Sequence, residues 1–215
     1  MPESRLAADQ DTGVSAVSSP LKILFLGAAP SDASRLSMDL EIREIDRRIQ
    51  LGALRDRCQL IQEWAVTAAD LSQILLRHRP AIVHFSGHGT PDGRLVLLDA
   101  QGKGYPVPQA ALTGLFALFC KEGLRCVVLS ACFAEEQAQA ISQHIEFTVG
   151  ISGAIADVSA TSFAAGFYSG LAGGASVQNS FALGQLQIMI LNQGQPEAPR
   201  LICRADADPN TSRLL

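Results

Sequence analysis

Short runs of large apolar residues alternate along this chain with stretches whose apolar residues recur at helical spacing. The clearest runs are LKILFLG (21–27), AIVHFSG (81–87), RCVVLSA (125–131) and EFTVGIS (146–152). A strand that is buried on both faces is apolar throughout, and strands that alternate with helices form a mostly parallel sheet with helices on both sides. The sequence therefore predicts an α/β fold, a three-layer α/β/α sandwich around a central sheet of about six strands.

The remaining elements follow from the same two patterns. Met38, Ile42, Ile45 and Ile49 fall at helical spacing and predict the first helix. Further strands are expected at 58–66 and 200–205, a hairpin within 94–107, and further helices at 69–78, 108–120, 134–144, 160–174 and 176–192. The last helix is apolar almost all round, which predicts burial on several of its sides.

The composition is that of one globular domain. Of the 215 residues, 47% are hydrophobic and 18% are charged, and this length can bury one sizeable core. The net charge of −4, without a basic block, excludes an electrostatic footprint for nucleic acid. No apolar run approaches the roughly 20 residues that span a bilayer, and the N-terminus lacks the order of a signal peptide. We therefore expect a cytoplasmic protein without direct nucleic-acid or membrane contacts.

The ends of the chain differ in pattern from its centre. Residues 1–20 contain no large aromatic residue and no sustained periodicity, which predicts a flexible tail or linker. The domain is expected over 21–206, followed by a C-terminal tail at 207–215. Five cysteines, an odd number without a CxxC pair, argue against a disulfide framework or a zinc site. They are expected to be thiols, and no metal or cofactor is expected.

Two of the apolar runs end in residues that carry chemistry. His88 follows the third strand in a Gly-His-Gly turn, and Cys132 follows the fourth core strand. Functional residues of an open parallel sheet gather where strands end at its carboxyl edge, so both residues are expected there. Their separation of 44 residues is close to the interval of roughly 50 between the caspase histidine and cysteine. A thiolate near an imidazole and a helix N-terminus is an activated nucleophile, so the pair predicts a catalytic dyad.

Taken singly, each residue has an ordinary structural interpretation. Cys132 would be a packing thiol and His88 a surface turn residue. Together, the Gly-His-Gly segment (87–89) and the Ser-Ala-Cys segment (130–132), at the ends of neighbouring strands, favour catalysis. Gly87 and Gly89 let the backbone turn sharply and leave N–H groups free to point at a developing oxyanion.

The motifs HFSGHG (84–89), VVLSAC (127–132), EEQA (135–138) and FAAGFYSGL (163–171) together resemble the CHAT domain. This is a bacterial branch of the caspase-like cysteine proteases, in the clan of caspases, metacaspases and separases. The likeness runs from about Lys22 to Ala205. It implies a caspase-type α/β/α fold and hydrolysis of peptide bonds by a His/Cys dyad.

The resemblance also implies roles for single residues. Carried over by position, His88 is the family histidine and Cys132 the nucleophile, and the backbone N–H groups of Gly89 and Cys132 would form the oxyanion hole. Many relatives have a Trp before an Ile-x-Asp after the fifth strand. Here GISGAIAD keeps Ile155 and Asp157 but lacks the Trp. Because CHAT domains usually accompany a repeat, sensor or nucleotide-binding domain, often in defence against phage, a protein substrate and a regulatory partner or sensor domain are implied.

Two features bear on specificity and control. Asp157, Glu135 and Glu136 are expected near one cleft, where they would attract a cationic side chain, so we predict a preference for Arg or Lys before the scissile bond. The alternative for Asp157 is a helix cap, and the alternative for the glutamates is the first turn of a helix. Without an Asp-rich processing linker, a single-chain enzyme is expected that stays nearly idle until a partner orders the loops 89–107 and 152–160.

Two other classes remain open. One is a flavodoxin-like small-molecule binding module with FLGAAPSD as its phosphate loop, although that loop has a single Gly and no Lys or Thr in the positions that grip phosphate. The other is a non-catalytic caspase-like scaffold. A scaffold has no chemical need for both His88 and Cys132, which favours the enzyme.

Overall fold

The structure, a computed structural model of the chain, describes residues 20–30, 32–191, 194–196 and 198–215. The predicted tail or linker at 1–20 lies outside the described residues except for Pro20. The strands are β1 (Leu21–Ala28), β2 (Cys58–Trp64), β3 (Ile82–Gly89), β4 (Leu95–Leu98), β5 (Gly104–Pro106), β6 (Cys126–Ser130), β7 (Phe147–Ile151) and β8 (Pro199–Cys203). The helices are α1 (Asp32–Leu51), α2 (Leu71–His78), α3 (Gln109–Phe119), α4 (Glu135–Ser142), α5 (Asp157–Ala172) and α6 (Val177–Ile190), with short 3₁₀ turns at Arg55–Arg57 and Cys120–Glu122.

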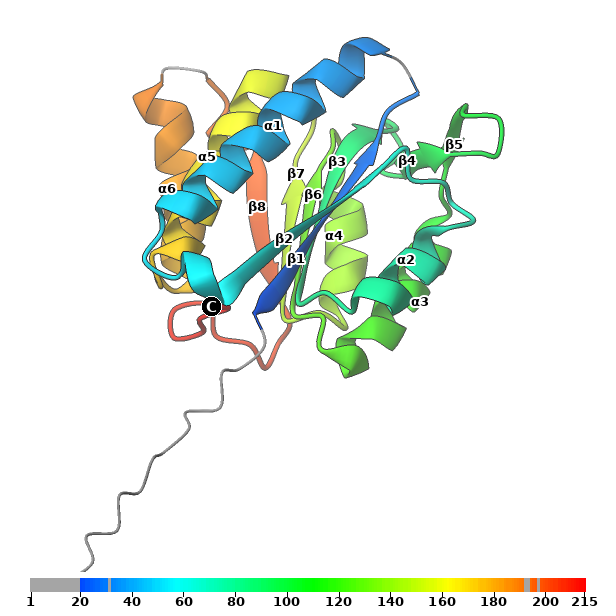
Figure 1. Ribbon diagram of the computed structural model, residues 1–215. Coiled ribbons are helices and arrows are strands. Elements are labelled where there is room, and N and C mark those ends of the chain that lie inside the picture. The colour runs from blue at the N-terminus through cyan, green and yellow to red at the C-terminus, as the bar shows by residue number, and fades with distance from the viewer. Residues whose placement is uncertain (1–19, 31, 192–193, 197) are drawn as a thin grey trace, which may run out of the picture.

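The central sheet has the strand order β2-β1-β3-β6-β7-β8. Every neighbouring pair in this order is parallel except β7 and β8, which are antiparallel. The hairpin β4–β5 is attached to the end of β3 and projects beyond the main sheet (Figure 1). The predicted α/β architecture with a mostly parallel sheet is confirmed.

Helices cover both faces of the sheet, and a separate apolar core lies under each layer (Figure 1). One core joins the sheet to α2, α3 and α4, and the other joins it to α1, α5 and α6. The predicted stripe of α1 faces the second core, since Met38, Ile42, Ile45 and Ile49 are all buried. α6 begins at a capped residue, because the Ser176 side chain accepts a hydrogen bond from the backbone N–H of Asn179.

β3 is longer than the sequence predicts, and His88 and Gly89 lie within it rather than after it. The cause is the hairpin, because β4 pairs antiparallel with the end of β3 at His88–Val96 and Gly89–Leu95. The apolar run itself stops earlier, since this last part of the strand pairs outside the main sheet. The backbone that carries the histidine is therefore held by hydrogen bonds on its hairpin side.

The composition of α6 predicts burial on several of its sides, and this prediction is wrong. Leu183, Leu186 and Met189 are all exposed. Its inner side packs closely on α5, where a Cβ added to Gly170 would lie 2.6 Å from the Cα of Ser180. Small residues allow this close approach, so one narrow face suffices to hold the helix.

Residues 207–215, predicted as a C-terminal tail, pack against the domain. Leu214 is buried in the core under α1, α5 and α6. The backbone N–H of Val177 donates a hydrogen bond to the carbonyl of Ser212, and the Arg213 side chain donates to the carbonyl of Gly174. The segment is thus part of the packed structure.

Candidate active site

The register of β3 and β6 brings His88 and Cys132 together. Ser86 and Ser130 are direct partners across these parallel strands, and each candidate dyad residue follows its serine by two positions. Neighbouring strands lie about 4.8 Å apart, and Cys132 lies in the turn directly after the end of β6. Both residues accordingly line one pocket, with a volume of about 80 Å³.

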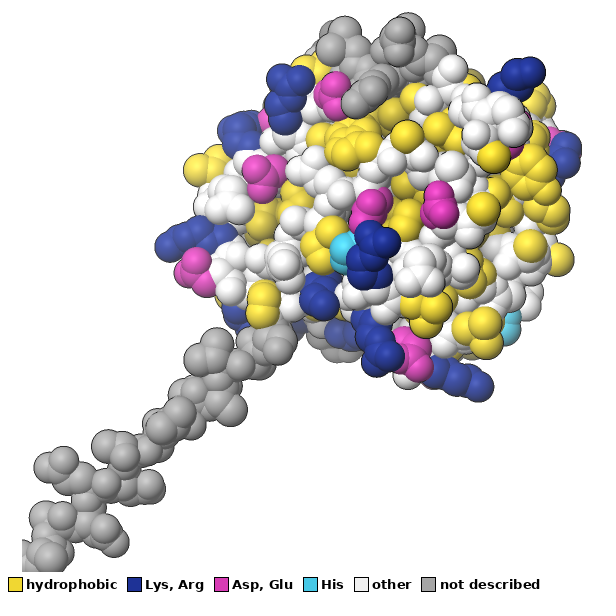
Figure 2. All heavy atoms as spheres, turned by 45° about the vertical axis from the view of Figure 1, so that its right-hand side comes forward, with side chains coloured by type: hydrophobic (Ala, Val, Ile, Leu, Met, Phe, Trp, Pro, Cys, Tyr) yellow, Lys and Arg dark blue, Asp and Glu magenta, His cyan; other side chains and the backbone are white. Residues whose placement is uncertain are grey.

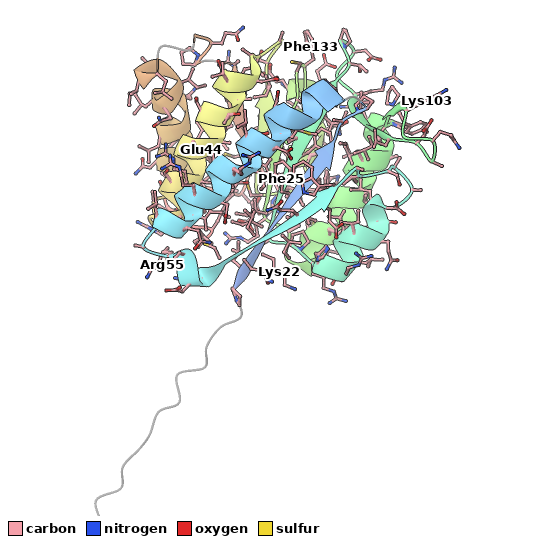
Figure 3. All side chains as sticks on the ribbon, turned by 45° about the horizontal axis from the view of Figure 1, so that its top comes forward. Lys22, Phe25, Glu44, Arg55, Lys103 and Phe133 are labelled. Carbon is pink, nitrogen blue, oxygen red and sulfur yellow. The ribbon has the colours of Figure 1, made fainter. Side chains whose placement is uncertain are left out.

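The backbones of Gly89 and Cys132 are in contact. A Cβ built on Gly89 would lie 1.9 Å from the carbonyl oxygen of Cys132 and 3.6 Å from its backbone nitrogen. Only glycine permits this approach. The contact lies at the carboxyl edge of the sheet: in Figure 3, Phe133, the residue after Cys132, lies at the end of the molecule away from Lys22 at the start of β1.

The chain turns sharply directly after Cys132. Phe133 has a φ of 58°, in the left-handed region, and its N–H donates a hydrogen bond to the carbonyl of Gly153 at 2.7 Å. The N–H of Ile155 lies 3.5 Å from the Cys132 Sγ and donates to it. The Cys132 Sγ in turn donates to the carbonyl of Ile155 at 3.8 Å. The loop after β7 therefore both holds the turn and contacts the sulfur.

A buried carboxylate lies at the base of the same pocket. Glu41 of α1 is 4% exposed and is among the residues that line the pocket. Its Oε2 accepts a hydrogen bond from Ser86 Oγ at 2.5 Å, and its Oε1 accepts one from Ser130 Oγ at 2.8 Å. These are the serines that precede His88 and Cys132 by two positions. Glu41 thus contacts both strand ends that carry the candidate dyad.

His84 and Tyr168 complete this buried cluster. His84 Nε2 lies 3.3 Å from Glu41 Oε1, close enough for attraction but without a well-aligned hydrogen bond, and its Nδ1 lies 3.2 Å from the Tyr168 hydroxyl. Burial raises the pKa of Tyr168 well above its ordinary value, so the phenol keeps its proton and can donate it to Nδ1.

The carboxyl group of Glu41 is held in its ionised form. Burial alone would raise the pKa of Glu41, but contact with His84 and the hydrogen bonds from the two serines lower the pKa below its ordinary value. The sequence analysis missed this residue. A signal was present, because Glu41 is a charged side chain next to the buried stripe of Met38, Ile42 and Ile45.

Cys132 differs from the other cysteines in its surroundings. All five cysteines are free thiols. Burial raises the pKa of Cys58 and Cys203, and it raises the pKa of Cys126, inside β6, to about 12. Cys132 is half-buried and lines the pocket. A reactive thiol is therefore expected at this position rather than in the strands.

The three acidic residues predicted near the cleft are placed differently. Asp157 lines the pocket, whereas Glu135 and Glu136 are not among its lining residues. Asp157 is exposed in the first turn of α5 and accepts a hydrogen bond from Ser37 Oγ of α1 at 2.5 Å. The alternative role of Asp157 as the cap of α5 is wrong, because Ala156 holds the cap position and no side chain makes a cap hydrogen bond there. Glu135 opens α4, where a carboxylate suits the helix dipole.

The described part of the chain also bears on metal ions, membranes and surface charge. There, no group of three or more His, Cys, Asp or Glu residues could hold a metal ion. Of the helices that the structure describes, none combines the length and the apolar character needed to cross a membrane. Figure 2 shows Lys and Arg side chains scattered among Asp and Glu on the face that it presents, in keeping with the net charge of −4.

The fold and the site together define a caspase-like α/β domain. A solved structure with the same arrangement is that of a secreted C11 cysteine protease from Bacteroides thetaiotaomicron in complex with an irreversible peptide inhibitor. It aligns with a TM-score of 0.61 at 11% identity, over 86% of this chain and 66% of the other. A sequence model of the CHAT domain matches residues 3–209. The chain belongs to the CHAT domain family.

Two relatives carry protease names. A protein of Gillisia limnaea named "Probable protease" is 26% identical over 153 residues, which cover 71% of this chain and 27% of that protein. A "Roc-COR-CHAT protease" from an unknown prokaryotic organism is 27% identical over 153 residues, which cover 68% of this chain and 14% of that protein. The chain therefore matches about a quarter of the first relative and a seventh of the second.

Proposed function

We propose that this chain is a cysteine endopeptidase domain that cleaves a protein substrate through Cys132 and His88. The observation that best supports the proposal is that His88 and Cys132 line one pocket, each two positions after a serine of the pair Ser86–Ser130. Membership of the CHAT family and the names of the two relatives support the same function.

In the proposed reaction, the Cys132 thiolate attacks the carbonyl carbon of the scissile bond, and the electron pair of the C=O bond moves to oxygen. The N–H groups of Gly89 and Cys132 donate to this oxyanion. As it collapses, the C–N bond breaks and His88 gives a proton to the leaving amine. Water then attacks the thioester and loses a proton to His88, which releases the carboxyl product and regenerates the thiolate.

The proposal extends to substrate charge and to control. Asp157 at the pocket rim would attract a cationic side chain of the substrate, and Glu135 would add to the negative field from the start of α4. We further propose a cytoplasmic effector of bacterial defence or signalling, triggered when a regulatory partner or sensor domain orders 89–107 and 152–160. The contact of Ile155 with the sulfur supports this, because moving that loop would change the environment of the nucleophile.

Alkylation by iodoacetamide tests the proposal without a known substrate. Cys132 should be modified first, and His88→Ala should slow its modification, while Cys126→Ala should leave the rate unchanged. Cys132→Ala and His88→Ala should each abolish cleavage, without additive losses, since the two residues act as a unit. N-terminal sequencing of a cleaved protein would identify the bond. If Cys132 reacts no faster than the other cysteines, and if His88→Ala does not change its rate, the non-catalytic scaffold would be the better interpretation.

A further inference from the structure

The pocket beside Cys132 has a charged base that the proposed reaction does not use. Its apolar lining comes from Met38, Ile155 and Ala160, and Glu41 supplies a carboxylate from α1. A pocket with apolar walls and a buried charge at its base suits a long apolar stem that ends in an opposite charge.

No Lys or Arg among the described residues pairs with Glu41. Its ion-pair partner among them is His84. The two serine hydroxyls stabilise the carboxylate as donors, yet each keeps lone pairs that can accept from a ligand. The carboxylate and the two hydroxyl oxygens can therefore accept hydrogen bonds from one cationic group.

The position of the pocket identifies which substrate residue enters it. His88 and Cys132 line the pocket together with Ser130, the last residue of β6, and Ala131. The side chain nearest to the attacked carbonyl belongs to the residue that supplies that carbonyl, because the two share one Cα. The occupant is thus the residue directly before the scissile bond.

We infer that Glu41 is the specificity-determining residue of this site and binds the cationic head of an Arg or Lys directly before the scissile bond. The inference rests on the proposed function and adds to it the residue that selects the substrate. Asp157 is exposed and already accepts a hydrogen bond from Ser37. Glu41 is buried, and a buried charge discriminates more strongly than an exposed one between charged and neutral side chains of the substrate.

Two peptidyl chloromethyl ketones that differ only in their last residue, arginine or citrulline, provide the test. Citrulline has nearly the shape of arginine without its charge. In each reagent the Cys132 sulfur forms a bond to the methylene carbon and chloride leaves, so labelling is stoichiometric and is read by mass spectrometry. A hydrogen bond to a charged group predicts labelling about 10- to 100-fold faster with arginine than with citrulline.

Glu41→Gln keeps the side-chain shape and removes the charge, and it should bring the two rates within about threefold of each other. The matched control is Glu44→Gln, three positions further on α1, where the carboxylate pairs with Arg47 and Arg48 outside this pocket. It should retain the wild-type ratio.

The outcomes separate the two proposals. Fast iodoacetamide labelling of Cys132, with equal rates for the two peptidyl reagents on the wild type, overturns the role of Glu41 and leaves the peptidase standing. A preference for arginine that survives in Glu41→Gln also overturns it. If no reagent labels Cys132 selectively, the proposed function fails, and this inference fails with it. The comparison on the wild type holds even if the variant does not fold.

Discussion

Replacing Gly89 by alanine would bring a methyl group into collision with the backbone carbonyl of Cys132, the candidate nucleophile. The new Cβ would lie 1.9 Å from the carbonyl oxygen of Cys132, a distance that real Cβ atoms do not adopt. The obstacle is main chain, so the strand ends must separate by about an ångström or more. A displacement of this size at a catalytic site can cost about 100-fold in rate. Overpacking of this kind typically costs about 1–3 kcal/mol in the free energy of unfolding.

The assay is the rate of Cys132 labelling by the arginine chloromethyl ketone, measured beside the midpoint of urea unfolding. Gly114→Ala is the matched control, because its Cβ would meet nothing within 4 Å in the middle of α3. Alanine is favoured over glycine in a helix by about 0.5–1 kcal/mol, so this control should be slightly stabilised and fully reactive. A folded Gly89→Ala protein that reacts at the wild-type rate would refute the assignment of this backbone contact to the site.

Three further outcomes follow from the buried groups. Tyr168→Phe should lower the free energy of unfolding by about 1–3 kcal/mol, measured in urea, because His84 loses a buried partner; an unchanged midpoint would contradict the cluster. Since burial raises the pKa of Cys126 to about 12, iodoacetamide should leave it unmodified in the folded protein and modify it in urea, and labelling of the native thiol would argue against its burial. Because the folded pKa of Glu41 lies below its ordinary value of 4.5, the carboxylate should stabilise the fold above that value and lose this effect as the pH falls through the folded pKa. The stability difference between wild type and Glu41→Gln should therefore shrink between about pH 7 and about pH 3, and a difference independent of pH would count against the ionised form.

The fold was accessible from the sequence because its strands and helices have simple periodicities. Buried positions take apolar residues, so burial appears directly in the sequence. Examples are the uninterrupted apolar run that ends at Gly87 and the spacing of Met38, Ile42 and Ile45. The antiparallel direction of β8 was not accessible, because an edge strand has the same apolar pattern in either direction.

The candidate site was predictable only in part. His88 lies in the last part of β3 and Cys132 follows β6, so the topology alone brings them to one edge. Glu41 was missed because it comes from a helix, and its contacts with Ser86 and Ser130 depend on how α1 packs across the sheet. No local pattern encodes a contact between residues so far apart in the chain. The close approach of Gly89 likewise depends on a tertiary contact.

The pairing of β3 with β4 has a mechanical consequence. His88 and Gly89 are the residues that pair with Val96 and Leu95, so the hairpin is fastened to the main chain of the site itself. The hairpin projects past the sheet, and Lys103 marks it in Figure 3. Because of this pairing, the hairpin and the end of β3 that carries His88 should move together. A displacement of the hairpin would therefore change the position of the imidazole relative to the Cys132 sulfur.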